Sequence, residues 1–548
     1  MPYVIAPARG VQQMSENSSR SVFVRDATGL TRQISGMTAL GMALNGMGLL
    51  YVFNVIVYTP GYYPTANPLV TAFVGLLFTV PLAGMYVLFS VAMPRTGGDY
   101  VWVSRIFTPS VGFITNFVIT ILNLSLIGIV IPQAVQWSGA EMFYDLGKIY
   151  GNQNYIDIAN YLQGTAPALW LSILLIVIAG VIVMLSLDFA ARITRYWVYI
   201  TIVIAVIFIA TVVSAGTSTF ITNFNALSGA NYNDIISAGQ QAGAVNGVPS
   251  ALSWSSMYAG ALGLLAFLGF NSSAYFAGEV KNSQRSQIFA QIGGIIIFAV
   301  FYTVMVAVEY FGEGPAFANA MAALWVSGSS QLPYINIPLA SGMSMFWTQN
   351  PLLVSIFNLG YGINIEMMNI SILFTMARNL FAWSFDRVMP TAFADVDKRT
   401  HTPLKATAIM VIVAVIFAYI ALYQFGLMAS LFSYGTAGTF IAYIVVAFAA
   451  IAYPYKRKDI FESSPALAKK KIGGVPLISL LGVISLVISV IVIYAVLLPA
   501  IGGPFVTVLS QGIIPTFLLG AAIYGIVWII RRRQGIDLSV IQKAIPPE

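Results

Sequence analysis

The stretch LWLSILLIVIAGVIVML at residues 169–185 carries no charged residue, and WVYITIVIAVIFIATVV at 197–213 has the same character. A helix needs about 20 apolar residues to cross the hydrocarbon core of a bilayer, so both runs predict transmembrane helices. The rest of the chain agrees, because 58% of its 548 residues are hydrophobic and 8% are charged, against about 25% charged in soluble domains. This composition excludes a water-soluble fold and predicts an all-α polytopic membrane protein.

Apolar segments of sufficient length, separated by charged residues or by Gly and Pro, predict about twelve transmembrane helices. They cover residues 34–58, 69–92, 110–140, 167–187, 195–215, 255–280, 287–312, 351–385, 406–424, 427–453, 476–499 and 509–531. Twelve helices place both termini on one side of the membrane, and that side then holds all 26 Lys and Arg residues except Lys148. Positive residues mark the cytoplasmic side, so we expect a plasma-membrane protein with both termini in the cytoplasm.

The same reading divides the chain into five parts. They are a cytoplasmic tail at 1–33, a ten-helix transport core at 34–453, a basic cytoplasmic loop at 454–475, two further helices at 476–531 and a cytoplasmic tail at 532–548. Two long segments on the opposite side, 216–253 and 313–350, contain no Lys or Arg. We expect them to be covering loops with short interfacial helices.

Glycine clusters interrupt two of the predicted helices. GMALNGMGLL at 41–50 lies in the first helix and GALGLLAFLGFNSS at 260–273 in the sixth. Interrupted helices at corresponding places in two halves of a transporter indicate a binding site, and the offset of five helices fits a repeat of helices 1–5 by helices 6–10. The alternative is that these small residues only let neighbouring helices pack closely.

Three ordered segments resemble motifs of the amino acid–polyamine–organocation superfamily of permeases. FLGFNSSAYFAGEVKNSQR at 267–285 is similar to that family's sixth helix and the loop after it. MPRTGGDYVWVSR at 93–105 is similar to the loop after helix 2, and ARNLFAWSFDRVMP at 377–390 to the loop after helix 8. The resemblance implies a five-plus-five inverted repeat with broken helices 1 and 6, two extra C-terminal helices and alternating access.

The sequence departs from this family in three places. Asn271 stands where many members have Glu, Ser283 replaces a usual Pro, and helix 5 lacks the lysine found in some proton-coupled members. These departures concern the coupling ion and leave the expected fold unchanged.

Free backbone groups at two helix breaks can bind both charged groups of an amino acid. We expect the substrate carboxylate at the N–H groups around Asn45, Gly46, Met47 and Gly48, and its ammonium at the carbonyls of Ala266, Phe267 and Gly269. The substrate side chain would meet Phe267, Phe270 and Asn271, although both Phe residues are equally explained by helix packing. Neither helix carries a charge at this depth, which favours neutral amino acids over cationic amino acids or polyamines.

Glu366 is the candidate for coupling transport to protons. It lies deep within the predicted helix 351–385 and shares one helical face with Asn358, Gly362 and Asn369. An ionised carboxylate is costly inside a membrane, so Glu366 should hold a proton and is a candidate proton carrier. Alternatively, it stays neutral and only ties helix 8 to a neighbour.

A second stripe on the same helix offers oxygen atoms for sodium. It contains Asn364, Ser371 and Thr375, and in sodium-coupled relatives of this fold helix-8 hydroxyls and helix-1 carbonyls hold the ion. We expect proton coupling through Glu366, with sodium at Ser371 and Thr375 as the alternative.

Charged residues in two of the motif loops form a predicted inner gate. They are Arg95, Asp99, Glu279, Lys281 and Arg285. We expect them to pair in the outward-open state, and the alternative is that they are only the positive charges of cytoplasmic loops.

Other classes of function find little support in the sequence. The chain has no Cys and a single His, His401, so we expect no catalytic cluster, no metal and no cofactor, and a protein that is not an enzyme. No filter motif indicates a channel, whereas a non-transporting sensor stays open. The basic runs 469–471 and 531–533 fit lipid headgroups and do not call for nucleic acid. The expected partners are an amino acid or amine, a proton or sodium ion and the lipid bilayer; the sequence leaves the oligomeric state open.

Overall fold

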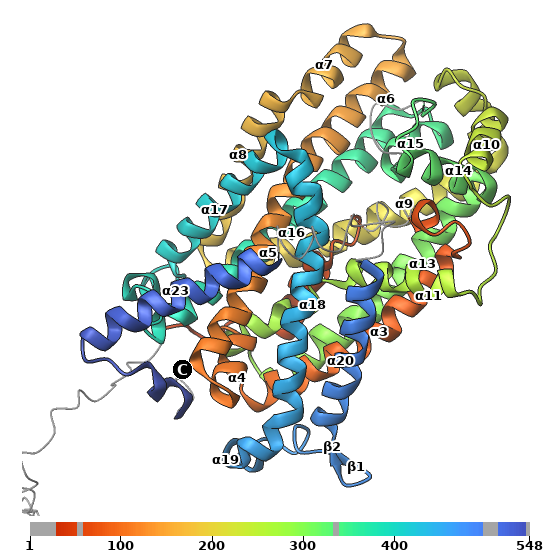
Figure 1. Cartoon of the computed structure of the whole chain (residues 1–548). Helices are drawn as coiled ribbons and strands as arrows, with labels where there is room; N and C mark the ends of the chain where they lie inside the picture. Colours follow the sequence, from red (N-terminus) through yellow and green to blue (C-terminus); the bar gives the residue numbers. More distant parts are fainter. Residues whose placement is uncertain (1–28, 52–58, 333–338, 497–512, 544–548) are drawn as a thin grey trace, which may run out of the picture.

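The computed structural model describes residues 29–51, 59–332, 339–496 and 513–543, and helices dominate them (Figure 1). The α-helices are α1 (Gly36–Met47), α3 (Pro68–Ala92), α4 (Asp99–Ile106), α5 (Pro109–Gln133), α6 (Ala140–Tyr150), α7 (Gln153–Gln163), α8 (Thr165–Leu185), α9 (Leu187–Leu227), α10 (Tyr232–Gln241), α11 (Trp254–Gly263), α12 (Ser283–Ile288), α13 (Gly294–Glu313), α14 (Pro315–Val326), α15 (Ala340–Trp347), α16 (Pro351–Phe385), α17 (Leu404–Tyr423), α18 (Phe425–Lys456), α19 (Lys458–Ser463), α20 (Leu477–Val496) and α23 (Ile514–Arg533). A short antiparallel hairpin pairs β1 (Lys471–Ile472) with β2 (Val475–Pro476).

Within the described residues, nine helices are long and apolar enough to cross a membrane. They correspond to nine of the predicted spans. The other three predicted spans are the first and sixth, which are interrupted, and the eighth, which is the continuous α16. α16 packs against α1, α5, α8, α9 and α17 inside the bundle. Its many buried polar residues face these helices and not lipid, and they lower its hydropathy below that of the other spans. The chain is therefore an all-α polytopic membrane protein, as predicted.

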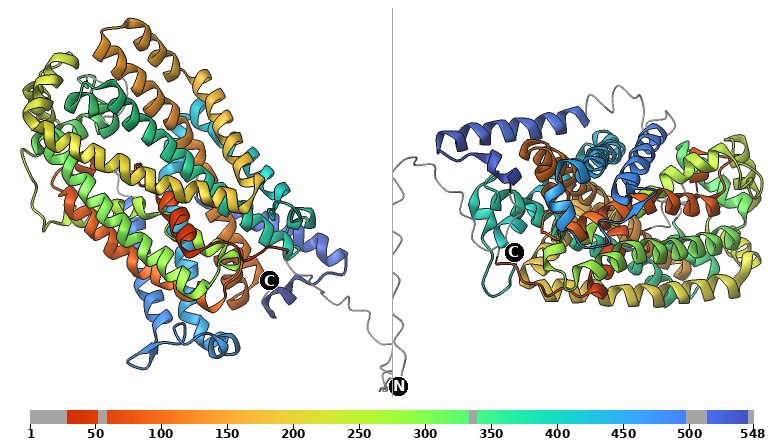
Figure 2. Two further views of the ribbon diagram at one scale, coloured as in Figure 1. Left: turned by 180° about the vertical axis from the view of Figure 1, so that it is seen from behind. Right: turned by 90° about the horizontal axis from the view of Figure 1, so that it is seen from below.

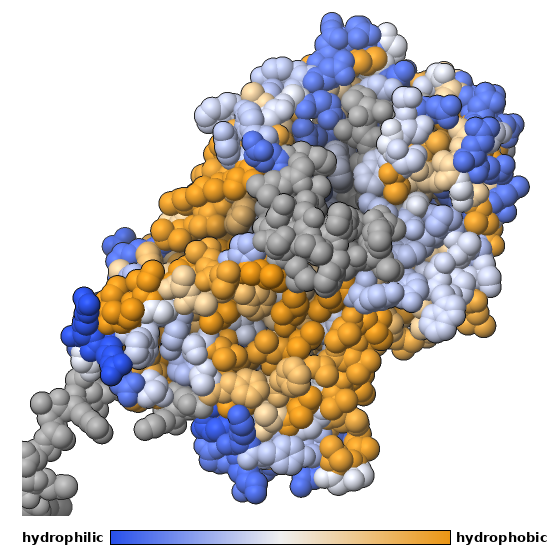
Figure 3. Space-filling view, in the orientation of Figure 1, coloured by the Kyte–Doolittle hydropathy of each residue, from blue (hydrophilic) through white to orange (hydrophobic). Residues whose placement is uncertain are grey.

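The short helices gather at two ends of the molecule. α6, α7, α10, α14 and α15 lie at one end, called here the α7 end, and α4, α19 and the hairpin lie at the other, called the α4 end (Figure 1). Apolar side chains cover much of the surface between them, and hydrophilic side chains gather at the tips (Figure 3). Such a surface is what a membrane-embedded bundle needs.

Helices 3 and 5 extend beyond their predicted ends. Helix 3 continues from α5 through a π-helical turn at Ala134–Gly139 into α6, which packs on α7. Helix 5 is α9, which continues to Leu227 past a kink at Gly216 and lies beside α13 (Figure 2). The sequence prediction ended both helices where their apolar runs stop. Packing against other helices at the α7 end supports the polar extensions.

The covering segments contain short helices, as expected. α10 lies in the first of them, and α14 and α15 lie in the second. α10 packs on α14, and α15 packs on α9 and α16. Together they close the α7 end over the bundle.

Candidate functional site

Helix 1 breaks at Gly48. This residue has φ 72° and ψ 73°, and its N–H donates to the carbonyls of Leu44 and Asn45. Helices commonly end at a glycine in the left-handed backbone conformation, because glycine has no Cβ to disfavour that conformation. Beyond the break, the Leu50 N–H donates to Asn364 Oδ1 of α16 at 3.0 Å, so α16 fixes the direction in which the chain leaves.

Helix 6 breaks over a longer stretch than predicted. α11 ends at Gly263, and only 3₁₀ turns follow, at Leu264–Phe267, Ser272–Tyr275 and Ala277–Glu279. The predicted helix 255–280 therefore ends early. Gly269, with φ 103°, reverses the chain between the first two turns, and 3₁₀ geometry suits short, irregular pieces of this kind.

The two breaks touch each other through their backbones. A Cβ added at Gly269 would lie 2.5 Å from the carbonyl carbon of Gly46, and one added at Gly46 would lie 2.8 Å from Ser272 Oγ. At Gly269 a side chain would collide with backbone atoms, so the close approach requires glycine there, whereas at Gly46 an added Cβ would meet the Ser272 hydroxyl. The structure thus brings together the glycine clusters of helices 1 and 6.

Other glycines of the two clusters serve helix packing. Gly41 lies against the backbone of Arg195 in α9, and Gly260 and Gly263 lie against Val74 and Thr71 in α3. For these three positions the alternative interpretation, close packing of helices, is the one that the structure supports.

Two of the carbonyls expected to bind substrate, and the Asn45 side chain, are engaged locally in this conformation. The Phe267 carbonyl accepts from the Phe270 N–H at 3.1 Å, and the Gly269 carbonyl accepts from the Ser272 N–H at 2.9 Å. The Asn45 side chain donates to the carbonyls of Gly41 and Thr194 at 2.9 and 2.7 Å. A ligand at the breaks would share or replace these bonds.

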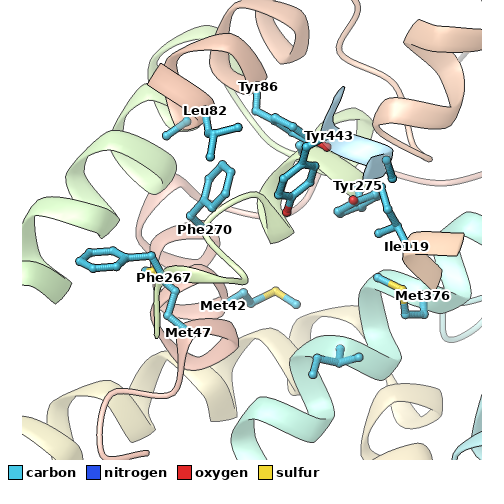
Figure 4. Packing of buried hydrophobic residues seen from close by; sticks show 14 of the residues in the cluster. Met42, Met47, Leu82, Tyr86, Ile119, Phe267, Phe270, Tyr275, Met376 and Tyr443 are labelled. Atoms are coloured by element: carbon cyan, nitrogen blue, oxygen red, sulfur yellow. The ribbon is translucent and has the colours of Figure 1, made fainter. Parts of the chain in front are cut away.

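Apolar and uncharged polar side chains surround the breaks (Figure 4). Phe267 packs edge-on against Phe298 of α13 at 5.0 Å between ring centroids, and Phe270 against Tyr86 of α3 at 5.7 Å. Both Phe rings are fully buried, as the packing alternative expects. Met42 and Met376 face the same region from α1 and α16.

A chain of hydrogen bonds leads from helix 6 to a buried acid. Asn271 Nδ2 lies 3.2 Å from Tyr443 Oη and 3.4 Å from Tyr275 Oη. The Tyr275 hydroxyl donates to Asp99 Oδ2 at 2.7 Å, and Tyr86 donates to the same oxygen at 2.9 Å. Burial raises the pKa of Asp99, and these hydrogen bonds partly oppose that effect. The position expected to meet the substrate is therefore linked to a carboxyl group near the α4 end.

Two fully buried ion pairs close the α4 end. Arg378 Nε and Nη2 donate to the two carboxylate oxygens of Glu279 at 3.0 and 3.1 Å. Arg105 contacts Asp386 at 2.8 Å, and the Tyr100 hydroxyl donates to the same carboxylate. The first pair joins the end of helix 6 to α16, and the second joins α4 to the end of α16.

The predicted gate residues separate into two groups. Asp99 and Glu279 lie in the buried network, whereas Lys281 and Arg285 are exposed and Arg95 donates to the neighbouring Pro94 carbonyl. The missed partners are Arg105, Arg378 and Asp386. All three stand within the family-like segments 93–105 and 377–390, so a search for charges in those motifs could have found them.

Glu366 lies inside the bundle with 8% of its surface exposed. Its Oε2 accepts from Asn369 of its own helix at 3.3 Å, and its Oε1 has no partner among the described residues. Residues of the same face meet helix 3, since Ser138 donates to the Asn358 carbonyl at 2.6 Å. Glu366 therefore lies on a different face from Asn364, which contacts helix 1.

The alternative ion ligands turn toward their own helix. The Ser371 hydroxyl donates to the Met367 carbonyl at 3.0 Å, and Thr375 donates to the carbonyls of Ser371 and Ile372. Across the described ranges, no three His, Asp or Glu side chains are grouped so that they could hold a metal.

Comparison of the sequence with known proteins identifies the family of the chain. Residues 34–527 match the family model described as amino acid permease. The chain belongs to the amino acid permease family. This match confirms the resemblance to the amino acid–polyamine–organocation superfamily and indicates a permease rather than an enzyme.

Two characterised relatives are similar to this permease. A branched-chain amino acid permease of Lactococcus lactis subsp. cremoris (strain MG1363) is 24% identical over 383 residues, which are 68% of this chain and 73% of that protein. A vacuolar cationic amino acid transporter of Arabidopsis thaliana is 27% identical over 207 residues, which are 37% of this chain and 29% of that protein.

Proposed function

We propose that this permease is a secondary active transporter of neutral amino acids that works by alternating access. The observation that carries the proposal is the contact between two helix breaks, Gly46 against Gly269, among uncharged side chains. Broken helices offer partial charges for the carboxylate and ammonium groups of an amino acid. Among the described side chains that contact the breaks none is acidic, so a cationic substrate side chain would lack a counter-charge there. One of the two relatives is named for branched-chain amino acids.

The buried ion pairs suggest how the site is closed on one side. Glu279–Arg378 and Arg105–Asp386 join helices that must separate for substrate to leave at the α4 end. We place this end in the cytoplasm of a plasma-membrane protein, because Lys148 is the only basic residue on the predicted opposite side. In this proposal the structure represents a state closed toward the cytoplasm.

Coupling is proposed through Glu366, with sodium at Ser371 and Thr375 as the second candidate. Support for Glu366 comes from its burial and from the unpartnered Oε1. A carboxyl group in such a place can gain and lose a proton with the conformational cycle. Glu366→Gln should abolish uptake driven by a proton gradient and leave counterflow exchange measurable, whereas a sodium requirement lost in Ser371→Ala would favour the second candidate.

Transport in liposomes tests the substrate class. Liposomes that contain the purified protein are loaded with leucine, and the entry of labelled leucine is measured under imposed proton or sodium gradients. Unlabelled neutral amino acids, cationic amino acids and polyamines are added outside as competitors. We expect competition by neutral amino acids only. Competition by arginine or polyamines alone would overturn the proposed substrate class, and linear, non-saturating flux would indicate a channel.

A further inference from the structure

After the C-terminal helix α23 the chain turns back toward α4 (Figure 1). Gly535 has φ 74°, and the Ile536 N–H donates to the Arg531 carbonyl at 2.9 Å. A bond of this kind around a left-handed glycine ends a helix and redirects the chain. Residues 535–543, called here the C-terminal segment, follow, and their 3₁₀ turns at Leu538–Lys543 contact α4 and α5.

Two apolar side chains dock the C-terminal segment on the bundle. Leu538 and Ile541 expose 2% and 0% of their surface and belong to the main apolar core. They are three residues apart and therefore lie on one face of a 3₁₀ turn, whereas Ser539 between them is exposed. Removal of the two apolar side chains from water favours the docked position.

Arg531 joins the end of α23 to the loop after α16. Its Nε donates to the Arg387 carbonyl at 2.8 Å, and its Nη2 donates to the Met389 carbonyl at 3.2 Å. Arg387 directly follows Asp386, the acid that pairs with Arg105 of α4. The end of α23 thus holds the loop next to one partner of this buried pair, and the C-terminal segment packs on the helix that carries the other.

α4 depends on its neighbours for its position, because a helix of eight residues is too short to be stable alone. From the end of α18, Lys456 lies over the ring of Phe107 at 5.0 Å, and Arg457 donates to the Arg105 carbonyl at 2.8 Å. The C-terminal segment adds contacts from a part of the chain outside the transmembrane helices. A short segment that is held mainly by two apolar side chains can detach locally while the bundle stays folded.

We propose that the C-terminal segment is a clamp that keeps the α4 end closed. The inference rests on the proposed function, in which α4 and the end of α16 move apart to release substrate at this end. Arg531 fixes the start of the segment to the loop after α16, and Leu538 and Ile541 fix the rest of it to α4 and the adjoining α5. Movement of α4 away from α16 would strain or break one of these attachments. The docked segment therefore favours the closed state, and its detachment shifts the population toward the open one.

Hydrogen–deuterium exchange of the purified full-length protein, read by mass spectrometry, tests the clamp without any substrate. Leu538→Asp places a carboxylate at a buried site, which is unfavourable enough to detach the C-terminal segment. We expect the backbone amides of α4 to exchange about tenfold faster or more than in the wild type, because burial of one leucine corresponds to roughly that factor in the opening equilibrium.

Two other regions show what faster exchange in α4 means. The helix 6 turns at 272–279 are joined to α16 by the Glu279–Arg378 pair, so their amides should speed up by the same factor as those of α4, since one opening exposes both. Amides of α15, at the α7 end, should keep the wild-type rate. Faster exchange in α4 alone would show that the segment only packs on α4, and faster exchange in all three regions would indicate general damage; either result overturns the proposal.

Matched variants control for charge and for folding. Ser539→Asp introduces the same charge at the exposed position between the two buried side chains, and all three regions should then exchange at the wild-type rate. A chain that ends at Gln534 lacks the C-terminal segment without gaining a buried charge, and it should behave as Leu538→Asp does. This shortened chain decides if Leu538→Asp fails to fold, and wild-type exchange of its α4 would overturn the clamp.

The exchange measurement also keeps the clamp separate from the proposed substrate. Exchange needs no substrate, so its result stands whether or not leucine crosses the membrane in the liposome assay. A wild type that carries no leucine would contradict the proposed substrate class alone.

Discussion

Gly269 and Gly216 both have a positive φ, but they differ in what surrounds them. Gly269 has φ 103° and lies against the backbone of Gly46, whereas Gly216 has φ 67° and nothing within 4 Å of an added Cβ. Alanine at Gly216 meets only backbone strain, of about 1 kcal/mol. Alanine at Gly269 must also push the two breaks apart. We expect Gly269→Ala to abolish substrate binding and to lower the unfolding temperature well below that of Gly216→Ala, as scanning fluorimetry and a binding assay would show. Equal behaviour of the two variants would mean that the contact between the breaks is unimportant.

Asp99 should give the folded protein a pH dependence of known sign. Burial raises the pKa of Asp99 above its ordinary value, so the folded protein binds this proton more tightly than the unfolded chain. The stability that this group contributes is then greatest at low pH and is lost as the pH rises above about 4 and through the folded pKa. Asp99→Asn should remove that slope, because an amide does not titrate, while its oxygen can still accept from Tyr86 and Tyr275. The measurement is the unfolding temperature of the wild type and of Asp99→Asn across pH. If both proteins change with pH in parallel, Asp99 does not contribute the expected slope.

Arg531 of α23 ties the C-terminal helix to the loop after α16. Arg531 Nε donates to the Arg387 carbonyl at 2.8 Å, and its Nη2 donates to the Met389 carbonyl at 3.2 Å. Arg387 directly follows Asp386, the partner of Arg105, and Met389 lies three positions after Asp386. We expect Arg531→Ala to reduce stability by about 1 kcal/mol, since hydrogen bonds from a charged group are lost at a partly buried site. Arg533→Ala, on the exposed last turn of α23, is the control and should unfold at the wild-type temperature.

Prediction from sequence succeeded where local pattern decides the element. The mostly apolar run at 351–385 predicted one helix, and α16 has the same limits. Helix 6 was misjudged because apolar content does not distinguish an α-helix from successive 3₁₀ turns, and the turns depend on contacts with helices 1 and 2. The pairing of Glu279 with Arg378 spans 99 residues. No local spacing indicates such a pair, although both residues stand in recognisable motifs.

At the scale of the whole molecule, access to the breaks should depend on the buried pair at the α4 end. Removing Arg378 leaves the Glu279 carboxylate buried without its partner, which costs about 3–5 kcal/mol. States in which helix 6 and α16 have separated do not bear this cost, because Glu279 reaches water there. The population of those states should therefore rise, provided that the rest of the fold holds.

A single introduced cysteine can report this shift, because the natural chain has none. Ser272 is buried beside Gly46 at the helix breaks, so Ser272→Cys should react slowly with a membrane-impermeant maleimide. We expect Arg378→Ala in that background to raise the rate about tenfold or more from the α4 side only, since a shift of 1.4 kcal/mol is already tenfold. Lys281→Ala, which removes an exposed charge in the neighbouring loop, should leave the rate unchanged. An unchanged rate in folded Arg378→Ala protein, or an increase from both sides, would show that the Glu279–Arg378 pair does not control which side of the membrane reaches the site.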